Sequence, residues 1–327
     1  MRDIAAEAGV SLSTVFRVLN SDVPVSPSVK AKVLAAKTDL ENREFEKSRS
    51  MNGLSVGIIM PSDPFSDESD HPSIYSIISS FSKELAKRGI TNGNIIFDGN
   101  EEISGIISDH GKSGYLVIGT SEEQEQLILS AISETGVPCF FVNRRTEASN
   151  AGSVGLDDET AAMEATEHLI SKGHRTIAFV GGNRDFQNTE RRLKGYEAAL
   201  RKHGLEIRED LILFGRYSEP SGYEMGEQLL RSEIRPTAAF FASDPLALGC
   251  LRYMKENGVR IPDDMAMIGF GNAEASRYSE PTLSTVSQPD REIGAAAAAA
   301  LVQMIENPVI RKMDVQLKTE LIIREST

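Results

Sequence analysis

Arg17 and Ser13 lie four residues apart and carry side chains that could bind a nucleic acid. An arginine guanidinium can donate two hydrogen bonds to a guanine edge or hold a phosphate, and a serine hydroxyl can bond to a base or a phosphate. Leu12 could contact a thymine methyl group, and Phe16 shares the same surface if the segment is helical. Together these side chains offer the chemistry needed to read a DNA groove.

Three short helices are predicted to position them. Gly9 suits the end of a first helix, Ser11 can cap a second that Asn20 closes, and Ser26-Pro27 is a typical start for a third. The apolar faces of the three helices are Ile4, Ala5 and Ala8; Val15, Val18 and Leu19; and Val29, Val33 and Leu34. A tight turn at Gly9 makes the first two a helix-turn-helix, whose second helix enters the major groove. From the spacing alone, an alternative to a DNA-binding unit is a three-helix structural domain in which Arg17 is only solvated.

Polar residues recur directly after short apolar runs in the rest of the chain. They are Asn143, Asp157, Ser243, Asp244 and Asn272. Open parallel sheets bind ligands at the carboxyl ends of their strands. If two such sheets face each other, these side chains can hydrogen-bond to a small molecule held between them.

The elements that would carry these residues alternate from Leu54 onward, as in parallel α/β sheets. Strands are predicted at 55–60, 95–97, 115–119, 139–143, 153–156, 176–180, 212–214, 238–242 and 267–270. Helices are predicted at 77–88, 124–134, 161–172, 191–203, 223–231 and 246–257, with a buried helix over the alanine-rich run 295–301. The fold class is therefore α/β, with two doubly wound units in series behind a helical head.

Composition excludes several classes of protein. The 327 residues are 40% hydrophobic and 25% charged, and no apolar stretch is long enough to span a membrane. The two cysteines, Cys139 and Cys250, lie in separate apolar runs, which favours reduced thiols in a cytoplasmic protein without a signal peptide. His168 and His174 lack partners at metal-ligand spacing, so we expect no metal and no cofactor. The absence of a phosphate loop, a zinc-protease motif and a nucleophile elbow argues against an enzyme.

The net charge of −13 is unevenly distributed. Residues 1–53 hold eight Lys or Arg against seven Asp or Glu, whereas the remainder holds 27 against 41. A near-neutral head is a weak electrostatic footprint for DNA, although a dimer with two heads doubles the phosphate contacts.

The chain resembles the LacI/GalR (lactose-repressor) family over nearly its whole length. In the head the shared residues are Asp3 to Ser11, Thr14-Val15, Arg17 to Asn20, Val25-Ser26 and Val33 to Ala36. Farther on they are Gly173 to Arg175, Arg192 to Tyr196, Ser243 to Gly249, Ile261 to Asp264, Ile268 to Phe270, Pro281 to Val286 and Leu321 to Thr327. The resemblance implies a helix-turn-helix headpiece joined to a two-lobed core similar to periplasmic sugar-binding proteins. It also implies a transcription regulator, expected to be a repressor, rather than an enzyme.

The resemblance further implies a DNA-binding surface on the second helix and on a hinge. The residues expected on DNA are Ser11, Leu12, Ser13, Thr14, Phe16, Arg17, Asn20, Arg49 and Met51. In the family the hinge folds on DNA, where Met51 would be an apolar wedge in the minor groove. Phe16 stands where the family favours a small hydroxyl residue, Glu44-Phe45 replaces a Pro-Asn pair, and no Ser or Thr cap precedes the first helix. A plain solvated linker is the alternative for the hinge.

A small-molecule site follows from the same resemblance. The residues expected to contact an effector are Ile74, Asn143, Arg192, Tyr217, Ser243, Asp244, Asn272 and Gln288. Asn272 replaces an acidic residue of the family, and the residues around Ile74 also depart from its pattern. The expected effector is a sugar, with a purine as the alternative. Asp244 is also expected to cap the following helix. For Tyr217 the alternative is a packing role, and for Arg192 the alternative is an exposed charge on the surface of a helix.

These inferences define the expected domains and partners. Residues 1–40 form the helix-turn-helix domain, 41–53 the hinge, 54–157 with 290–315 the N-terminal lobe, and 158–289 with 316–327 the C-terminal lobe. The expected partners are palindromic operator DNA, the effector and a second copy in a homodimer, without a tetramer-forming coiled coil. The competing hypothesis is a carbohydrate-sensing binding protein with a weakened or vestigial DNA-binding head, and replacing Arg17 with alanine separates the two.

Overall fold

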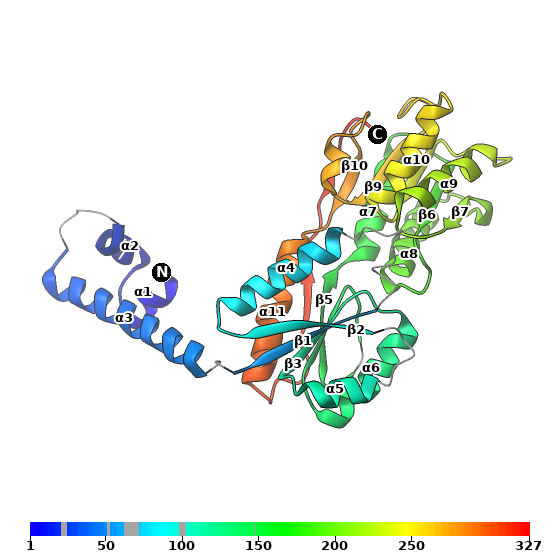
Figure 1. The fold of residues 1–327 in the computed structure, drawn as a ribbon. Coiled ribbons are helices and arrows are strands. Elements are labelled where there is room, and N and C mark those ends of the chain that lie inside the picture. The colour runs from blue at the N-terminus through cyan, green and yellow to red at the C-terminus, as the bar shows by residue number, and fades with distance from the viewer. Residues whose placement is uncertain (21–24, 51–52, 62–71, 98–102, 147) are drawn as a thin grey trace. The chain divides into compact units, whose positions relative to one another are not determined.

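The computed structural model describes residues 1–20, 25–50, 53–61, 72–97, 103–146 and 148–327 (Figure 1). The chain divides into two compact units, Met1–Leu54 with Ala86–Thr91 and Ser55–Leu85 with Asn92–Thr327. We call residues 1–50 the head and residues 55–327 the body. Each is described by itself.

The head consists of three helices, α1 (Arg2–Ala8), α2 (Leu12–Asn20) and α3 (Pro27–Ser50). Gly9 ends α1 in a left-handed conformation with φ 64°, and the Ser11 hydroxyl accepts a hydrogen bond from the Thr14 amide at 3.2 Å. Both predicted caps are thereby confirmed. A small hydrophobic core of Ala5, Val15 and Val33, with Ile4, Ala8, Val10, Val18 and Leu19 against it, fixes which face of α2 turns outward.

Helix α3 continues through most of the segment predicted to be a hinge. It begins at Pro27, as the preceding Ser26 predicts, and it runs without a break to Ser50. The expected boundary at residue 40 thus falls inside a helix. Arg49 lies in the last turn of α3, its side chain outside the described part of the structure, and Met51 lies outside the described residues altogether.

The body contains two six-stranded sheets, and the first belongs to the N-terminal lobe. Its order is β11-β5-β4-β3-β1-β2, and the pairs β1–β3, β3–β4, β4–β5 and β5–β11 are parallel. The strands are β1 (Ser55–Pro61), β2 (Thr91–Phe97), β3 (Gly114–Val117), β4 (Cys139–Val142), β5 (Ala151–Leu156) and β11 (Asp314–Leu317). The helices of this lobe are α4 (Pro72–Ala86), α5 (Ile103–His110), α6 (Glu122–Thr135) and α11 (Asp290–Glu306).

The second sheet forms the C-terminal lobe in the order β12-β10-β9-β8-β6-β7. It is parallel except for β12, which pairs antiparallel with β10. The strands are β6 (Ile177–Gly181), β7 (Ile212–Phe214), β8 (Ala238–Phe241), β9 (Ala266–Gly271), β10 (Ser284–Ser287) and β12 (Leu321–Ile322). The helices are α7 (Asp158–Ser171), α8 (Gln187–Lys202), α9 (Glu219–Arg231) and α10 (Asp244–Glu256), with short 3-10 turns η2 (Glu209–Leu211) and η3 (Glu274–Arg277).

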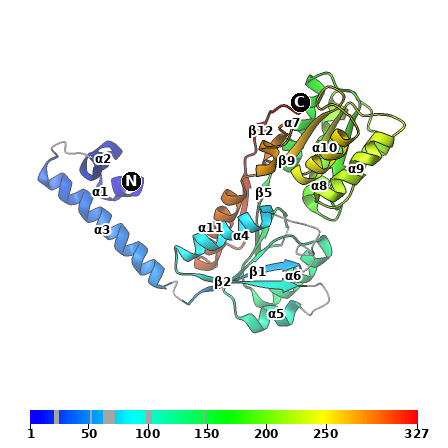
Figure 2. The same cartoon turned by 45° about the horizontal axis from the view of Figure 1, so that its top comes forward.

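The chain crosses between the two lobes after β5, after β10 and after β11, as can be followed in Figure 2. Because β11 pairs with β5 as far as Leu317, the last crossing comes after residue 317 instead of residue 315. The first crossing leads directly into α7 at Asp158, and the second leads into α11 at Asp290. Polar residues at these crossings therefore lie close to both sheets.

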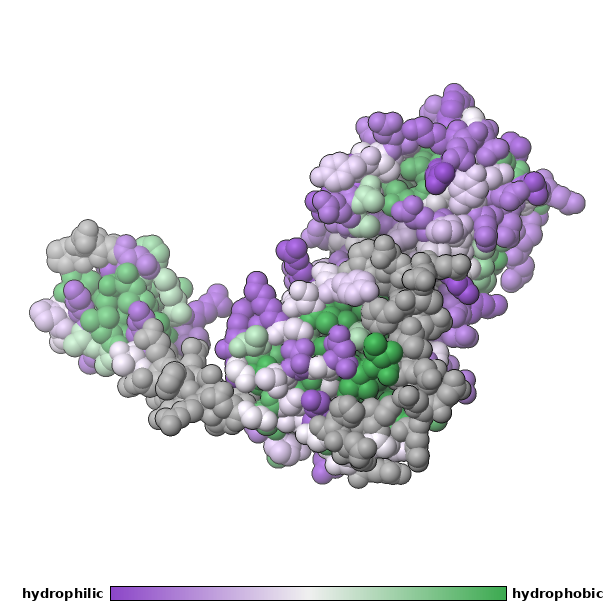
Figure 3. All heavy atoms as spheres, in the orientation of Figure 1, coloured by the Kyte–Doolittle hydropathy of each residue, from purple (hydrophilic) through white to green (hydrophobic). Residues whose placement is uncertain are grey.

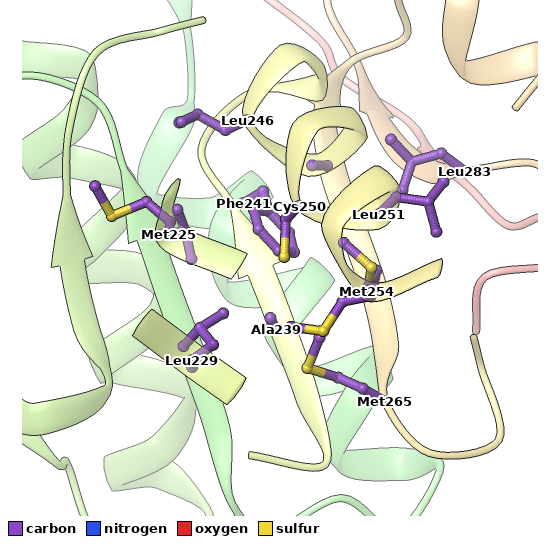
Figure 4. Close-up of a cluster of buried hydrophobic side chains, with 14 of the residues drawn as sticks. Met225, Leu229, Ala239, Phe241, Leu246, Cys250, Leu251, Met254, Met265 and Leu283 are labelled. Atoms are coloured by element: carbon purple, nitrogen blue, oxygen red, sulfur yellow. The ribbon is translucent and has the colours of Figure 1, made fainter. Parts of the chain in front are cut away.

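Helices α9 and α10 pack tightly over one face of the second sheet, where Met225, Phe241, Cys250 and Met254 are buried together (Figure 4). A Cβ atom at Gly222 would come within 2.1 Å of the Leu246 carbonyl oxygen. Since even a methyl group does not fit there, the two helix backbones are in direct contact, and this contact fixes the start of α10 against α9.

One face of the two lobes can be compared in a space-filling view. In Figure 3 the C-terminal lobe, at the upper right, is mainly hydrophilic, whereas hydrophobic patches are visible on the N-terminal lobe. Within the described residues, no helix has the length and apolar character needed to cross a membrane.

Candidate functional site

Helix α2 presents two large apolar side chains to solvent beside its polar ones. Leu12 is 47% exposed and Phe16, one turn later, is 54% exposed. Arg17 is also exposed, and the Ser11 and Ser13 hydroxyls lie 3.0 Å apart at the start of the helix. Of the α2 residues predicted to bind DNA, only Thr14 is half-buried; the others are exposed. An exposed mixture of apolar, hydroxyl and guanidinium groups on one short helix suits contact with base edges and phosphates.

Arg192 is the centre of a polar cluster in the body. It is only 4% exposed, so the competing role of a surface helix charge is wrong. Its Nε donates to Asp158 Oδ1 at 2.8 Å, its Nη1 donates to the Ala242 carbonyl at 2.6 Å, and its Nη2 donates to Gln288 Oε1 at 3.4 Å. The guanidinium carbon lies 3.5 Å from the centroid of the Phe270 ring. A buried guanidinium needs such a counter-charge and such acceptors, and the structure supplies them from three segments of the chain, with the Phe270 ring from a fourth.

Gln288 extends this cluster into the N-terminal lobe. Its Nε2 donates to Ser73 Oγ and to Asp290 Oδ1, both at 2.7 Å, and Ser73 Oγ donates to the same carboxylate oxygen at 2.7 Å. Burial raises the pKa of Asp290. The half-buried Ile74 follows Ser73 at the start of α4, so this predicted residue lies next to the cluster in sequence.

Asp244 does not cap α10 as expected. Ser243 is the cap, accepting a hydrogen bond from the Leu246 amide at 3.4 Å, and Asp244 is the first residue of the helix. The fully buried Asp244 carboxylate instead accepts hydrogen bonds from Thr285 Oγ1 at 2.6 Å and from the Ala273 amide at 2.7 Å. Burial raises its pKa to about 6. The carboxylate therefore stabilises the ends of β9 and β10 rather than the helix amides.

Asn272 joins the same network from the end of β9. Its backbone is left-handed with φ 53°, and its amide donates to Thr285 Oγ1 at 3.2 Å. Its Oδ1 accepts a hydrogen bond from Arg324 Nη2 at 2.7 Å. Asp244 and Asn272 are thus brought together through Thr285, and the Asp244 carboxylate and Asn272 Oδ1 are already engaged within the protein.

Tyr217 is half-buried and packs against the hydrophobic core of its lobe. Its hydroxyl lies 2.6 Å from Thr189 Oγ1, and its ring stacks on Phe186 with the centroids 6.3 Å apart. A Cβ atom at Gly182 would come within 2.3 Å of the Tyr217 ring, so the glycine makes room for it. Burial raises the pKa of the tyrosine. Packing is therefore an observed role of Tyr217, and stacking on a sugar stays a prediction.

Asn143 lies apart from these networks, at the end of β4. Its backbone is left-handed with φ 56°, and its Oδ1 is buried without a hydrogen-bond partner among the described residues. It lines a cavity of about 330 Å³ together with Asp158, Arg145 and Arg191. The predicted effector residues thus fall into three groups: the Arg192–Gln288 cluster, the Asp244–Asn272 network and the cavity at Asn143.

Several residues of these groups were not among the predicted contacts. They are Ser73, Asp158, Thr285, Asp290 and Arg324. Asp158 could have been found, because it follows β5 by the same strand-end rule that selected Asp157. Arg324 had no such signal, since its partner Asn272 is 52 residues away in the sequence.

The chemistry of the site is that of binding. The polar groups are amides, hydroxyls, carboxylates and guanidinium groups, which hydrogen-bond well to a polyhydroxylated ligand. No group of three His, Cys, Asp or Glu in the described part of the chain could hold a metal ion.

Comparison with known proteins bears on both parts of the chain. Residues 1–41 match the family described as bacterial regulatory proteins, lacI family, and residues 166–327 match the periplasmic binding protein-like domain. The catabolite control protein A of Priestia megaterium is 32% identical over 340 residues, which cover 99% of this chain and 98% of that protein.

Two solved structures are similar along much of the chain. A complex of the transcriptional regulator CelR with cellobiose has a TM-score of 0.76 and 28% identity, covering 100% of this chain and 99% of that one. A transcriptional regulator from Enterococcus faecium with bound ribose has a TM-score of 0.73 and 25% identity, covering 84% of this chain and 98% of that one. The similarity thus extends over the head, the linking segment and both lobes.

Proposed function

The chain belongs to the LacI family of bacterial transcription regulators, and from this premise we propose that a sugar, bound at the Arg192 cluster, controls its affinity for operator DNA. The observation that carries the proposal is the position of Arg192. It is a buried guanidinium hydrogen-bonded to Asp158 at the start of α7 and to Gln288 after β10. Gln288 in turn bonds to Ser73 of the other lobe.

The class of effector follows from the polar groups and from the relatives. Amide and hydroxyl groups such as those of Gln288 and Ser73 can exchange their mutual hydrogen bonds for bonds to ligand hydroxyls. Two relatives were solved with the sugars cellobiose and ribose. Both points favour a carbohydrate over a purine, which would need an apolar slot for its flat ring.

The same contacts suggest how binding is coupled to DNA. An effector changes an equilibrium only by its different affinity for the two states. Because the Gln288 amide connects Arg192 to Ser73 across the two lobes, a ligand that replaces these bonds favours one arrangement of the lobes over another. We expect that arrangement to set how two heads of a dimer meet the DNA.

The DNA contacts are proposed for the exposed face of α2. Leu12, Ser13, Phe16 and Arg17 would enter the major groove of each half of a palindromic operator. The hinge contacts of Arg49 and Met51 remain part of the proposal. The palindrome requires a homodimer, which is supported by the apolar patches on the N-terminal lobe in Figure 3. Such a regulator acts in the cytoplasm, where the DNA is.

Operator binding by matched variants tests the proposal. Purified protein is used to select binding sites from a random DNA pool. The most enriched site is then titrated with the protein in the presence and absence of each sugar of a panel. We expect a palindromic site whose affinity changes with one sugar. Arg17→Ala should weaken binding about 10- to 100-fold, because a bidentate arginine–guanine contact is worth roughly 1–3 kcal/mol. Arg201→Ala, at an exposed arginine of α8, should leave it unchanged.

The outcomes separate the two hypotheses. If the folded protein recovers no site, or if Arg17→Ala binds the selected site as well as the parent does, the helix does not read DNA as proposed. Sugar binding without any operator would then identify a carbohydrate-sensing protein whose head is no longer functional.

A further inference from the structure

Helix α3 consists of an apolar part and a polar part. The apolar part belongs to the core of the head, where Val33 is fully buried and packs with Ala5 and Val15 of the two preceding helices. The polar part, residues 41–50, has the sequence ENREFEKSRS, with one aromatic and no aliphatic side chain. We call residues 41–50 the α3 extension. The described core of the head therefore fixes the first part of the helix, and the extension continues from it.

No helix-breaking residue separates the extension from the rest of α3. Residues 28–52 contain no proline and no glycine, the two residues that most strongly interrupt a helix. The structure accordingly has one helix from Pro27 to Ser50 (Figure 1). The first glycine after the helix is Gly53, whose φ of 112° is a conformation that other residues rarely adopt. A turn of the backbone is thus placed at residue 53, beyond the extension.

Extending an existing helix costs much less than starting a new one. A separate helix must order several residues for its first hydrogen bond, so an isolated helix of about ten residues is marginal in water. The extension avoids this step, because the packing of Val33 already orders the preceding turns of α3. Each further residue then adds one backbone hydrogen bond to a helix that already exists.

The composition and the order of charges of the extension also favour a helix. Six of its ten residues are Glu, Lys or Arg, which are good helix formers. Among residues 37–50, opposite charges stand three or four positions apart five times, and like charges do so twice. The opposite pairs are Lys37–Glu41, Asp39–Arg43, Arg43–Glu46, Glu44–Lys47 and Glu46–Arg49, and the like pairs are Glu41–Glu44 and Arg43–Lys47. Opposite charges at this spacing stabilise a helix, so the balance of pairs supports the extension.

We propose that the α3 extension is helical in the free protein and acts as a preformed arm, so that operator binding does not require it to fold. This inference rests on the DNA-binding role proposed above for the head. It differs from the expectation taken from the family, in which the hinge folds on DNA. A segment that is already ordered loses little conformational entropy when DNA binds, so its contacts with DNA contribute more fully to affinity.

Hydrogen exchange of the full-length protein, with and without its selected operator, tests whether the extension is preformed. Amides of an ordered helix are protected from exchange, whereas those of a segment that folds on binding are protected only when DNA is present. Without DNA, we expect the amides of residues 45–50 to exchange about tenfold or more slowly than in an unfolded chain. The proposal is wrong if they exchange as in an unfolded chain until the operator is added.

Glu44→Pro and Glu44→Ala form a matched pair, because both remove the same charge but only proline interrupts the helix. In Glu44→Pro the residues after the break must start a helix of their own, so residues 45–50 should lose their protection in the free protein. Operator binding should weaken about tenfold or more, because these residues must then be ordered when DNA binds. Glu44→Ala should keep both the protection and the affinity of the parent, since alanine is a good helix former.

Arg17→Ala separates this inference from the proposed function. It should weaken operator binding and leave the exchange of residues 45–50 in the free protein unchanged. If Arg17→Ala has no effect on binding, α2 does not read DNA as proposed, and the exchange of the free protein still decides whether the extension is helical. If Arg17→Ala weakens binding but Glu44→Pro binds as tightly as the parent or more tightly, α2 reads DNA and the preformed arm is refuted.

Discussion

The two lobes end a central strand in the same way but use the asparagine that follows differently. Asn143 after β4 and Asn272 after β9 both adopt the left-handed conformation, with φ 56° and 53°. The Asn272 side chain accepts a hydrogen bond from Arg324 at 2.7 Å, whereas Asn143 Oδ1 is buried and has no partner among the described residues. In the C-terminal lobe the polar group stabilises the loop, and in the N-terminal lobe it makes no hydrogen bond with any described residue.

The arginines differ within each lobe rather than between the lobes, since Arg144 of the N-terminal lobe is buried and paired with Glu125. Arg192 and Arg324 are each engaged by several acceptors in the C-terminal lobe, including Asp158 and the Leu283 carbonyl. Arg145, in the N-terminal lobe, faces the cavity without an ion pair among the described residues. A polar residue at the end of a strand is therefore not a ligand contact by position alone. Its existing partners decide whether its removal affects the fold or only the binding.

The largest effect should come from Arg192, whose neighbour Arg191 is the matched control. Arg192→Ala leaves Asp158 buried without its counter-charge, and it should lower the free energy of unfolding by about 3–5 kcal/mol. Arg191→Ala should change it by about 0.5 kcal/mol or less, because this arginine has no ion pair to lose. Urea denaturation followed by circular dichroism measures both values.

Equal losses of unfolding free energy in Arg192→Ala and Arg191→Ala would contradict the distinction between a paired and an unpaired arginine. They would mean that Arg191 is held within the fold as firmly as Arg192. Arg192→Met is a useful companion, because it keeps much of the side-chain volume and so separates the lost charge from lost packing.

A smaller effect, dependent on pH, should come from Asp244. Its pKa of about 6 in the folded protein lies above the ordinary value of 3.8, so the folded state binds the proton more tightly than the unfolded state. Asp244 therefore favours folding most below about pH 4, and this contribution is lost as the pH rises through 6. The difference of about two units corresponds to about 3 kcal/mol across this window.

Asp244→Asn, which cannot ionise, isolates this contribution. Between pH 4 and pH 6 the stability of the parent protein should fall relative to that of the variant, and the difference should be constant above about pH 7. Urea midpoints at each pH give the two curves, and the remaining acidic groups cancel in their difference. Parallel curves through the whole range would show that Asp244 is ionised at its ordinary pKa and is not desolvated as the structure indicates.

Much of the architecture could be predicted because it depends on local patterns. The caps at Gly9 and Ser11, the start of α3 at Pro27 and the alternation of strands and helices follow from residues close together in the sequence. The strand-end rule also placed Asn143 and Asn272 correctly at the ends of β4 and β9. Such features depend on backbone geometry that the sequence specifies directly.

The partners of these residues could not be predicted in the same way. Thr285 lies 41 residues from Asp244, and it competes with the amides of α10 for the carboxylate. The sequence suggests only the partners nearest along the chain, the amides at the start of α10. That prediction was wrong, because the Asp244 carboxylate accepts a hydrogen bond from the buried Thr285 hydroxyl instead. For residues 41–50 the polar composition left a linker and a marginal helix as alternatives, and the structure has a helix that ends at Ser50.

The smallest effect, and the sharpest test of the comparison, lies in the two asparagines themselves. Asn143→Gly keeps the left-handed backbone and removes a buried oxygen without a partner, so it should stabilise the free protein by up to about 1 kcal/mol. Asn272→Gly also keeps the backbone but loses the bond to Arg324, so it should destabilise by about 1–2 kcal/mol. Thermal unfolding without ligand measures both, and changes of the same sign would show that the lobes do not differ as described. If the signs are opposite, the Asn143 side chain costs stability in the free protein, as expected of a group kept for a ligand.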